Sequence, residues 1–396
     1  MRTTYATKNI FLQPFRRQSG KLKESVYNHF YQKAEHHLSK ANIQINGDNP
    51  WDIQVHNKNL YQRVLAEGSL GLGESYMDGW WDCHCLDEFF NRILRAGLDK
   101  TVQSWKMIFD HLKARLFNFQ KISRACQVGK KHYDIGNDLY GCMLDELMIY
   151  SCAYWKNANT LDDAQEAKLD LVCRKLNLKP GMTVLDIGCG WGGTARFAAE
   201  RHGVDVTGVT VSEEQLNFGC DMCQGLPVDI KLQDYRSLNG KFDRILSIGM
   251  FEHVGYKNYR TFMEKTKTLL KDDGLVVLQT IGANRSTVRI DPWIDKYIFP
   301  NAMLPSPLQV AAAVDGLFVI EDWQNLGPDY EKTLMQWHQN FQEKWHDLKH
   351  FYDDRFYRMW NYYLLSCAGT FRARKNQLWQ IVLSPSGVPG GYRPKI

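Results

Sequence analysis

An acidic residue followed at once by closely spaced glycines is the part of this sequence that indicates chemistry most directly. Residues 184–193, VLDIGCGWGG, form an apolar run that contains Asp186 and then breaks into glycines. This pattern predicts a strand, a tight turn and a helix, in which Gly188 and Gly190 let a ligand approach the backbone closely. The N–H groups at the start of the helix would bind an anionic group. The segment therefore predicts a site for a nucleotide-like ligand, although a turn without a ligand would carry the same glycines.

The position of Asp186 bears on which nucleotide is bound. The spacing Asp-x-Gly-x-Gly resembles the first motif of S-adenosylmethionine-dependent methyltransferases, whereas dinucleotide sites usually carry Gly-x-Gly-x-x-Gly. Gly193 completes the second spacing as well. The motif alone therefore leaves both ligands open, and the neighbouring segments must decide between them.

Alternating strands and helices after residue 180 predict an α/β domain with a doubly wound, Rossmann-like sheet. The expected strands are residues 183–187, 205–210, 229–232, 242–248 and 274–280, and the expected helices are residues 193–202, 213–223 and 257–270. Ligands bind at the carboxyl ends of such strands. Four clusters should therefore converge in space: residues 186–190, 210–215, 233–235 and 250–253.

The second and third strands are followed by polar residues that could contact the ligand. The second strand ends without an acid, so Thr210 and Gln215 are its polar candidates, while Ser212 is predicted to cap the next helix. After the third strand, Asp234 could accept a hydrogen bond from an exocyclic amine, and Tyr235 could stack on the ring. An ordinary turn aspartate would look the same at position 234.

Length and composition predict a two-domain globular protein. Its 396 residues exceed the size at which one core is usual, and 44% hydrophobic with 23% charged residues are ordinary proportions. Apolar residues at helical spacing, on both sides of a Gly-rich loop at residues 68–81, predict a small, mostly helical first domain. We predict this domain at residues 1–115, a basic linker at 116–130 and the catalytic domain at 131–396.

Charge and apolar runs weigh against several classes of protein. A net charge of +5 fits weak attraction to an acidic membrane surface, and the absence of a dense basic patch predicts no nucleic-acid partner. No apolar run reaches the roughly 18 residues of a membrane span, and residues 1–17 lack the apolar segment of a signal peptide. We therefore expect a cytoplasmic or membrane-peripheral protein. No metal is predicted, because the pairs Cys83 with Cys85 and Cys220 with Cys223 lack a second half at zinc spacing.

Further segments fit one family of methyltransferases. Residues 150–155 (YSCAYW) and 249–255 (GMFEHVG), together with the Asp186 motif, resemble cyclopropane-fatty-acyl-phospholipid synthases. Residues 132–138, 291–301 and 68–81 extend the resemblance over nearly the whole chain. The last of these segments resembles the longer bacterial enzymes of the family.

The resemblance implies a reaction at a lipid double bond. In this family the methyl group of S-adenosylmethionine is transferred to a cis double bond of a phospholipid acyl chain, and loss of a proton from the added carbon closes a cyclopropane ring. No base can activate an alkene, so the enzyme must align it with the methyl group and keep water from the cation that forms. The family uses a bound bicarbonate ion as the base. Carried onto this sequence, the positions that hold the ion are Cys152, Glu252, Gln279, Ile281 and Tyr330.

One of these positions departs from the family. Glu252 is expected to orient the bicarbonate, Tyr330 to donate its hydroxyl, and Cys152 to contribute its backbone N–H while its thiol stays inert. Gln279 stands where the family usually has histidine. Because glutamine donates hydrogen bonds but takes up no proton at neutral pH, we expect altered bicarbonate dependence or rate and retained activity.

The resemblance also assigns cofactor and lipid positions. Family positions that hold S-adenosylmethionine match Tyr150, Ser151, Gly188, Gly190, Thr210 and Gln215, and the loop that borders the adenine matches Gln233, Asp234 and Tyr235. The aromatic segment 293–299, with Pro300 and Pro305, would form an apolar wall for the acyl chain, although a lid packed for stability fits as well. His253 is compatible with either a structural or a catalytic role.

We therefore expect a homodimeric enzyme at the inner face of the membrane that cyclopropanates unsaturated phospholipid acyl chains, with the N-terminal domain in membrane docking or dimer contact. A sibling methyltransferase that leaves a methyl branch would share every motif. A non-catalytic lipid or S-adenosylmethionine-binding module is suggested by Gln279 alone. A nucleic-acid methyltransferase fits less well, because its Asn-Pro-Pro-Tyr type of motif is absent.

Overall fold

The computed structural model describes residues 28–100 and 136–393. The chain divides into two compact units, residues 1–104 and 105–396, and each unit is described by itself. The predicted boundary at residue 115, the predicted linker at 116–130 and the family segment at 132–135 lie outside the described residues.

The N-terminal unit is mostly helical, as the spacing of its apolar residues predicts. Its elements are helical residues 28–39, α2 (Leu60–Glu67), α3 (Ser69–Met77), α4 (Leu86–Arg95), the 3-10 helix η1 (Leu98–Lys100), and the antiparallel strands β1 (Gln54–Val55) and β2 (Trp81–Asp82). The fully buried Trp81 packs on Phe89 of α4 with ring centroids 5.3 Å apart. This contact joins the short strand pair to the helices of the unit.

The prediction of a Gly-rich loop at residues 68–81 is wrong, because most of this segment forms helix α3. Gly71 is buried, and a Cβ at this position would lie 2.6 Å from the backbone oxygen of Arg63 in α2. The glycine therefore allows two helices to approach closely. The guanidinium of Arg63 also pairs with Glu74 at 2.5 Å and with Asp78 at 2.7 Å.

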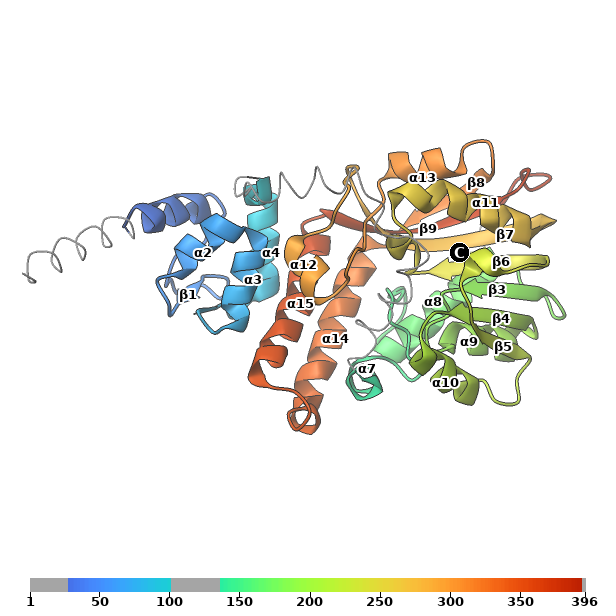
Figure 1. Cartoon of the computed structure of the whole chain (residues 1–396), viewed down its shortest axis with the longest axis horizontal. Helices are drawn as coiled ribbons and strands as arrows, with labels where there is room; N and C mark the ends of the chain where they lie inside the picture. Colours follow the sequence, from blue (N-terminus) through green and yellow to red (C-terminus); the bar gives the residue numbers. More distant parts are fainter. Residues whose placement is uncertain (1–27, 101–135, 394–396) are drawn as a thin grey trace, which may run out of the picture. The chain divides into compact units, whose positions relative to one another are not determined.

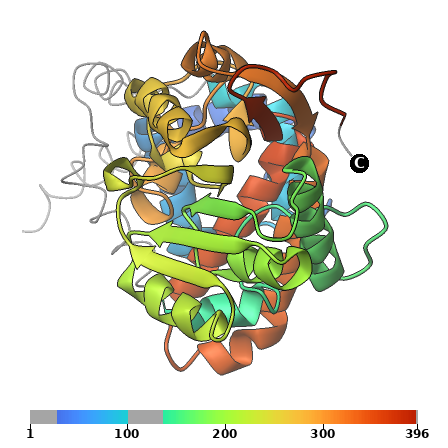
Figure 2. The ribbon, with the colours of Figure 1, turned by 90° about the vertical axis from the view of Figure 1, so that its right-hand side faces the viewer.

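The second unit is built on a seven-stranded sheet in the order β5-β4-β3-β6-β7-β9-β8 (Figures 1 and 2). The strands are β3 (Thr183–Ile187), β4 (Asp205–Thr210), β5 (Val228–Leu232), β6 (Phe242–Ile248), β7 (Leu270–Ala283), β8 (Val319–Asn325) and β9 (Asn376–Ser384). The first five are parallel to one another, and β9 is antiparallel to both β7 and β8. The strand order reverses between β3 and β6, which is where doubly wound sheets bind ligands.

Helices cover both faces of this sheet. They are α7 (Asn137–Met143), α8 (Leu161–Lys175), α9 (Gly193–His202), α10 (Glu213–Met222), α11 (Tyr259–Leu269), α12 (Pro292–Tyr297), α13 (Pro307–Val314), α14 (Gly327–Leu348) and α15 (Asp354–Arg372). One buried core joins the sheet to α11 and α13, and another joins it to α8 and α9. The long helices α14 and α15 lie side by side (Figure 1).

The predicted elements between residues 183 and 280 are all present: β3, α9, β4 and β6 have the predicted ends, and the ends of the other four are shifted. The strand expected at 274–280 is the longer β7, and the helix expected at 257–270 begins at Tyr259, after the 3-10 helix η4 (Tyr256–Asn258). Ser212 caps α10 as predicted, because its hydroxyl accepts the Gln215 N–H at 3.3 Å. No prediction covers β8, β9, α14 or α15.

Candidate active site

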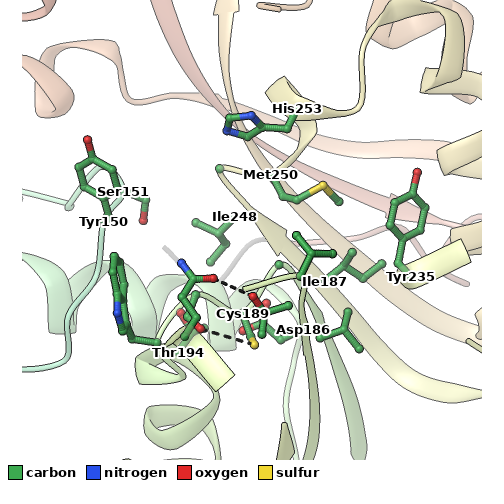
Figure 3. A pocket seen from close by; sticks show the side chains of 18 of the residues that line it. Tyr150, Ser151, Asp186, Ile187, Cys189, Thr194, Tyr235, Ile248, Met250 and His253 are labelled. Atoms are coloured by element: carbon green, nitrogen blue, oxygen red, sulfur yellow. Dashed lines mark hydrogen bonds between the residues drawn. The ribbon is translucent and has the colours of Figure 1, made fainter. Parts of the chain in front are cut away.

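A cavity of about 230 Å³ lies at the carboxyl ends of β3, β4 and β6 (Figure 3). We call it the cofactor cavity. All ten residues predicted to bind the cofactor line it: Tyr150, Ser151, Asp186, Gly188, Gly190, Thr210, Gln215, Gln233, Asp234 and Tyr235. In Figure 3, Tyr150 and Ser151 lie on one side of the cavity and Tyr235 lies on the other. The four sequence clusters expected to converge therefore do so.

Glycines shape the floor of the cofactor cavity. Gly188 has a φ of +84°, and a Cβ there would lie 2.8 Å from the side chain of Met250. Gly190 has a φ of +55°, and a Cβ there would meet no described atom within 4 Å. Since Gly190 lines the cavity, this open space is room for a ligand to approach the backbone. The backbone of Leu147 also approaches closely, because a Cβ on Gly193 would lie 2.0 Å from its oxygen.

A buried lysine lies beside the acid of the glycine motif. Asp186 is 2% exposed, and its Oδ2 has no hydrogen-bond partner among the described residues. Burial raises the pKa of Asp186 to about 7, and the charge of Lys168 opposes this shift. The fully buried Lys168 donates to the Ser151 hydroxyl at 3.2 Å, and burial lowers the pKa of this lysine to about 8.

The sequence analysis misses Lys168, although a signal is present. The residue stands four positions after Ala164 and four before Val172, both buried residues of α8, and therefore on the apolar face of this helix. A lysine at such a position has its ammonium group inside the protein. Trp191 and Thr194 also line the cavity and lie outside the four clusters predicted from the sequence.

The polar residues after β4 and β5 are held by internal hydrogen bonds. The Thr210 hydroxyl donates to Gln215 Oε1 at 2.7 Å, and both side chains are buried. Asp234 accepts from Arg236 Nε at 2.8 Å and Nη2 at 2.5 Å. Burial opposes the charge on Asp234, but these hydrogen bonds outweigh it and lower the pKa of the carboxyl group. The Asp234 carboxylate is thus ionised and already oriented at the cavity edge.

A second group of residues, which we call the buried polar cluster, lies outside the cavity lining: Cys152, Glu252, Ile281 and Tyr330. Glu252, in the 3-10 helix η3 (Phe251–His253), accepts the Ile281 N–H on Oε1 at 2.6 Å. Its Oε2 has no hydrogen-bond partner within the described ranges. Burial raises the pKa of Glu252 to about 7, against the opposing effect of the Ile281 N–H. Two members of the buried polar cluster are next in sequence to residues that line the cavity: Cys152 follows Ser151, and Glu252 precedes His253.

The first turns of α14 bring Tyr330 and the segment that carries Cys152 together. Tyr330 lies in α14, and both Cys152 and Glu252 are near enough to raise the pKa of its phenol beyond the effect of burial. Thr333, one turn further along, accepts the Ala153 N–H at 3.1 Å and the Trp155 indole N–H at 3.0 Å. Asp329 accepts the Trp155 backbone N–H at 2.8 Å. We call these three hydrogen bonds the α14 clamp, since they fix the segment that carries Cys152.

The Cys152 thiol has the surroundings of an inert group. It is fully buried, and burial raises its pKa well above the ordinary value. Its Sγ donates to the Ala153 carbonyl at 3.1 Å. A thiol that stays protonated is a poor nucleophile, which agrees with a role through the backbone.

Gln279 differs from the other four predicted bicarbonate residues in its contacts. Its side chain is 1% exposed, and its Oε1 accepts from Gln380 Nε2 at 2.9 Å. Its own Nε2 has no partner in the part of the chain that the structure describes. Gln279 and Ile281 project from the same face of β7, because side chains alternate along a strand.

Aromatic rings surround the Tyr150 side of the cofactor cavity. The Tyr150 hydroxyl lies 2.8 Å from that of Tyr363 in α15, and the Tyr150 ring packs on Trp337 of α14 at 5.2 Å. Phe299 belongs to the same group, with its ring 6.4 Å from that of Tyr150, 5.9 Å from that of Tyr363 and 5.8 Å from that of His253. Burial lowers the pKa of His253 to about 4, so this cavity-lining imidazole is neutral at pH 7.

The predicted apolar wall at 293–299 is split between two environments. Trp293 is fully buried and packs on Tyr362 of α15 at 4.5 Å, so it belongs to the core. Phe299 and Pro300 instead reach the aromatic group and the cavity. Among the described residues, no three His, Cys, Asp or Glu side chains are grouped to hold a metal ion. No helix within those same residues is long and apolar enough to cross a membrane.

Comparison with known sequences gives one family. The family described as mycolic acid cyclopropane synthetase matches residues 120–381. The cyclopropane-fatty-acyl-phospholipid synthase of Escherichia coli strain K12 is 54% identical over 365 residues, which cover 92% of this chain and 95% of that protein.

Solved structures give the same result for the second unit. The cyclopropane synthase MmaA2 of Mycobacterium tuberculosis matches with a TM-score of 0.62 and 31% identity, over 65% of this chain and 97% of that one. The mycolic acid cyclopropane synthase CmaA1, solved in complex with SAH and CTAB, matches with a TM-score of 0.61 and 32% identity, over 65% of this chain and 97% of that one.

Proposed function

The chain belongs to the mycolic acid cyclopropane synthetase family and is an S-adenosylmethionine-dependent methyltransferase, and on this premise we propose its reaction. The methyl carbon of S-adenosylmethionine is transferred to a cis double bond of a phospholipid acyl chain, and loss of a proton closes a cyclopropane ring. The observation that carries the proposal is Glu252, a buried carboxyl group next in sequence to the cavity-lining His253, with one oxygen held by Ile281 and the other without a partner.

The cofactor cavity fits S-adenosylmethionine by its own chemistry. Gly190 leaves room at the backbone, and Asp186 has a buried oxygen without a partner, as expected where a ligand would donate. Tyr150 and Ser151 would close one side, while Gln233, Asp234 and Tyr235 would border the adenine. The bound cofactor supplies an electrophilic methyl group.

The buried polar cluster fits a small anion that both donates and accepts hydrogen bonds. Glu252 Oε2 offers an acceptor, while the Tyr330 hydroxyl and the backbone N–H of Cys152 are donors. Gln279 would add its free amide N–H. Bicarbonate has this mixture of groups and would supply the base that accepts the proton. The cluster would orient that base beside the cofactor cavity and exclude water from it.

The aromatic group would protect the electron-deficient carbon. Tyr150 lines the cavity and its ring packs with those of Phe299 and Trp337, so this group would exclude water there. Ring faces also attract a cation, by about 0.5–2 kcal/mol. The same rings form an apolar surface on which an acyl chain can lie.

Contact with the membrane follows from the substrate, because the acyl chain belongs to a bilayer lipid. The N-terminal unit would assist docking at the cytoplasmic face or contact a second copy in a homodimer. Sedimentation with vesicles, comparing the full chain with a chain that begins at residue 105, tests the first role. Analytical ultracentrifugation of the same two proteins tests the second.

Mass spectrometry of lipids tests the reaction. Purified protein is incubated with S-adenosylmethionine and vesicles of monounsaturated phospholipid, with bicarbonate or under carbon-dioxide-free conditions. We expect a gain of CH2 with loss of the double bond, and a slower reaction without bicarbonate. A gain of CH2 with a double bond retained would identify a branching methyltransferase instead, because loss of a proton from a neighbouring carbon would leave an alkene in place of the ring. Cofactor binding without any lipid product would leave only a binding module.

A further inference from the structure

Two buried glutamine side chains meet across neighbouring strands close to the proposed bicarbonate site. Gln279 of β7 and Gln380 of β9 are 1% and 0% exposed, and the strand register places them opposite each other. Gln380 Nε2 donates to Gln279 Oε1 at 2.9 Å. Gln279 Nε2 and Gln380 Oε1 have no partner among the described residues.

Apolar pairs isolate this contact on both sides. Two residues before and after Gln279 on the same face of β7, Val277 faces Val382 and Ile281 faces Leu378. Neither pair offers a hydrogen bond from its side chains. The Gln279 oxygen therefore depends on Gln380 for the one donor that the structure gives it.

The contact decides which end of the amide is available to a ligand. A glutamine amide has an acceptor oxygen on one side and a donor nitrogen on the other, and the two can exchange places by rotation. With its oxygen held by Gln380, the Gln279 amide has its nitrogen turned away from that contact, and this nitrogen is the donor that it can offer to a ligand. A buried N–H without a partner costs about 1–3 kcal/mol, which an anion that accepts from it would recover.

We propose that Gln380 is a positioning residue for the bicarbonate site: it holds the Gln279 amide so that this side chain acts as a fixed donor toward the anion. The inference rests on the proposed function, since it takes the bound anion to be bicarbonate. It also explains how a glutamine serves at this position. The amide keeps the hydrogen bond to the anion, and its orientation depends on β9.

Substitution of Gln380 by methionine tests this role, because methionine has nearly the same size and cannot donate. Lipid methylation is measured across a range of bicarbonate concentrations, and S-adenosylmethionine affinity is measured by calorimetry. We expect Q380M to raise the KM for bicarbonate about tenfold, the effect of one hydrogen bond to a charged group, with cofactor affinity unchanged. Q380N, whose shorter amide cannot reach Gln279, should act in the same direction.

Two comparisons separate positioning from a general effect on the sheet. Gln324 of β8 stands opposite Gln380 on its other side, and Q324M should leave the KM for bicarbonate unchanged. In a Q279M background, Q380M should add no further effect, because the group it positions is gone. Additive effects of the two substitutions, or an unchanged KM in both Q380M and Q380N, would overturn the inference.

The wild-type protein separates this inference from the proposed function. If its rate is independent of bicarbonate under carbon-dioxide-free conditions, both the bicarbonate base and the role of Gln380 are wrong. If the wild-type rate depends on bicarbonate and the Gln380 variants behave like wild type, only the role of Gln380 fails.

Discussion

The cofactor cavity and the buried polar cluster lie next to each other but are built in different ways. The cavity is formed mainly by backbone turns at the ends of β3, β4 and β6, and short sequence motifs specify those turns. The cluster joins residues from distant parts of the chain, since Cys152 and Tyr330 are brought together by the α14 clamp. One site thus depends on local sequence, and the other depends on tertiary packing.

The two sites also differ in the groups that surround their buried acids. The acid of the cavity, Asp186, has the buried Lys168 beside it, which opposes the effect of burial on its pKa. For Glu252 in the cluster, the groups that oppose the effect of burial on the pKa are backbone N–H groups and the Thr280 hydroxyl, and no cation of the described residues is among them. Substitutions in the cluster should therefore impair chemistry, whereas substitutions in the cavity should impair cofactor binding.

The largest effect is expected from Glu252→Gln. This change removes the carboxylate proposed to orient the base, and general acid–base contributions of this kind are about a hundredfold or more. We expect that loss in the rate of lipid methylation, with S-adenosylmethionine affinity within about twofold of wild type. E264Q, on the exposed face of α11, is the matched control. A near-normal rate for E252Q would show that the cluster does not take part in the reaction.

The same substitution should change the pH dependence of stability. The pKa of Glu252 is raised from 4.5 to about 7, so the folded protein keeps a proton that the unfolded chain releases in this window. Stability contributed by that proton is present below pH 4.5 and is lost as pH rises toward 7. In bicarbonate-free buffer, E252Q should be more stable than wild type by about 2 kcal/mol at pH 8. Denaturant unfolding at pH 8 and pH 5 checks this, because the difference should shrink at the lower pH.

Breaking the α14 clamp should lower both the stability of the fold and the rate of methylation. Thr333→Val removes the acceptor for the Ala153 and Trp155 N–H groups, which should cost about 1–2 kcal/mol of unfolding free energy. The methylation rate should fall because Cys152 is no longer held. T333S keeps the hydroxyl and should restore both values. Equal behaviour of the two variants would show that packing, and not these hydrogen bonds, holds the segment.

A substitution in the lining of the cofactor cavity should weaken the binding of S-adenosylmethionine. A Cβ at Gly190 would extend into open space, so Gly190→Ala should weaken S-adenosylmethionine binding about tenfold by filling the cavity. The backbone cost of alanine at positive φ is about 1 kcal/mol. Gly225→Ala has the same kind of backbone cost at a φ of +82° outside the cavity lining, and should leave affinity unchanged. Titration calorimetry compares the two variants.

The sequence predicts the cavity better than the surroundings of the cluster, for physical reasons. The apolar run before Gly188 and the alternation after it specify β3, the turn and α9 by short-range rules, and the other cavity segments follow strands of the same pattern. The strand β9 carries four polar residues, Asn376, Gln377, Gln380 and Ser384, although most of its residues are buried. Neither alternation nor a continuous apolar run identifies such a strand.

Family resemblance and the fold identify different residues near the proposed bicarbonate site. The resemblance assigns Gln279 a position, but only the pairing of β7 with β9 shows that Gln380 binds it. For Lys168 the sequence alone shows the position, on the apolar face of α8, without any family resemblance. Its contact with Ser151 is known only from the structure. A buried polar side chain becomes informative once its partner is known.

The place of β9 in the sheet has a consequence for synthesis of the protein. This strand follows β7 and β8 in the chain, yet it lies between them. Until residues 376–384 have left the ribosome, the edge of β7 that β9 will cover has no strand partner, and a nascent chain exposes it to other chains. The strands β3 to β7 can assemble earlier, whereas the setting of Gln279 is completed only when β9 inserts. The strands around the cofactor cavity are therefore synthesised before the strand that holds Gln279, and a chaperone that shields the β7 edge would act in the interval.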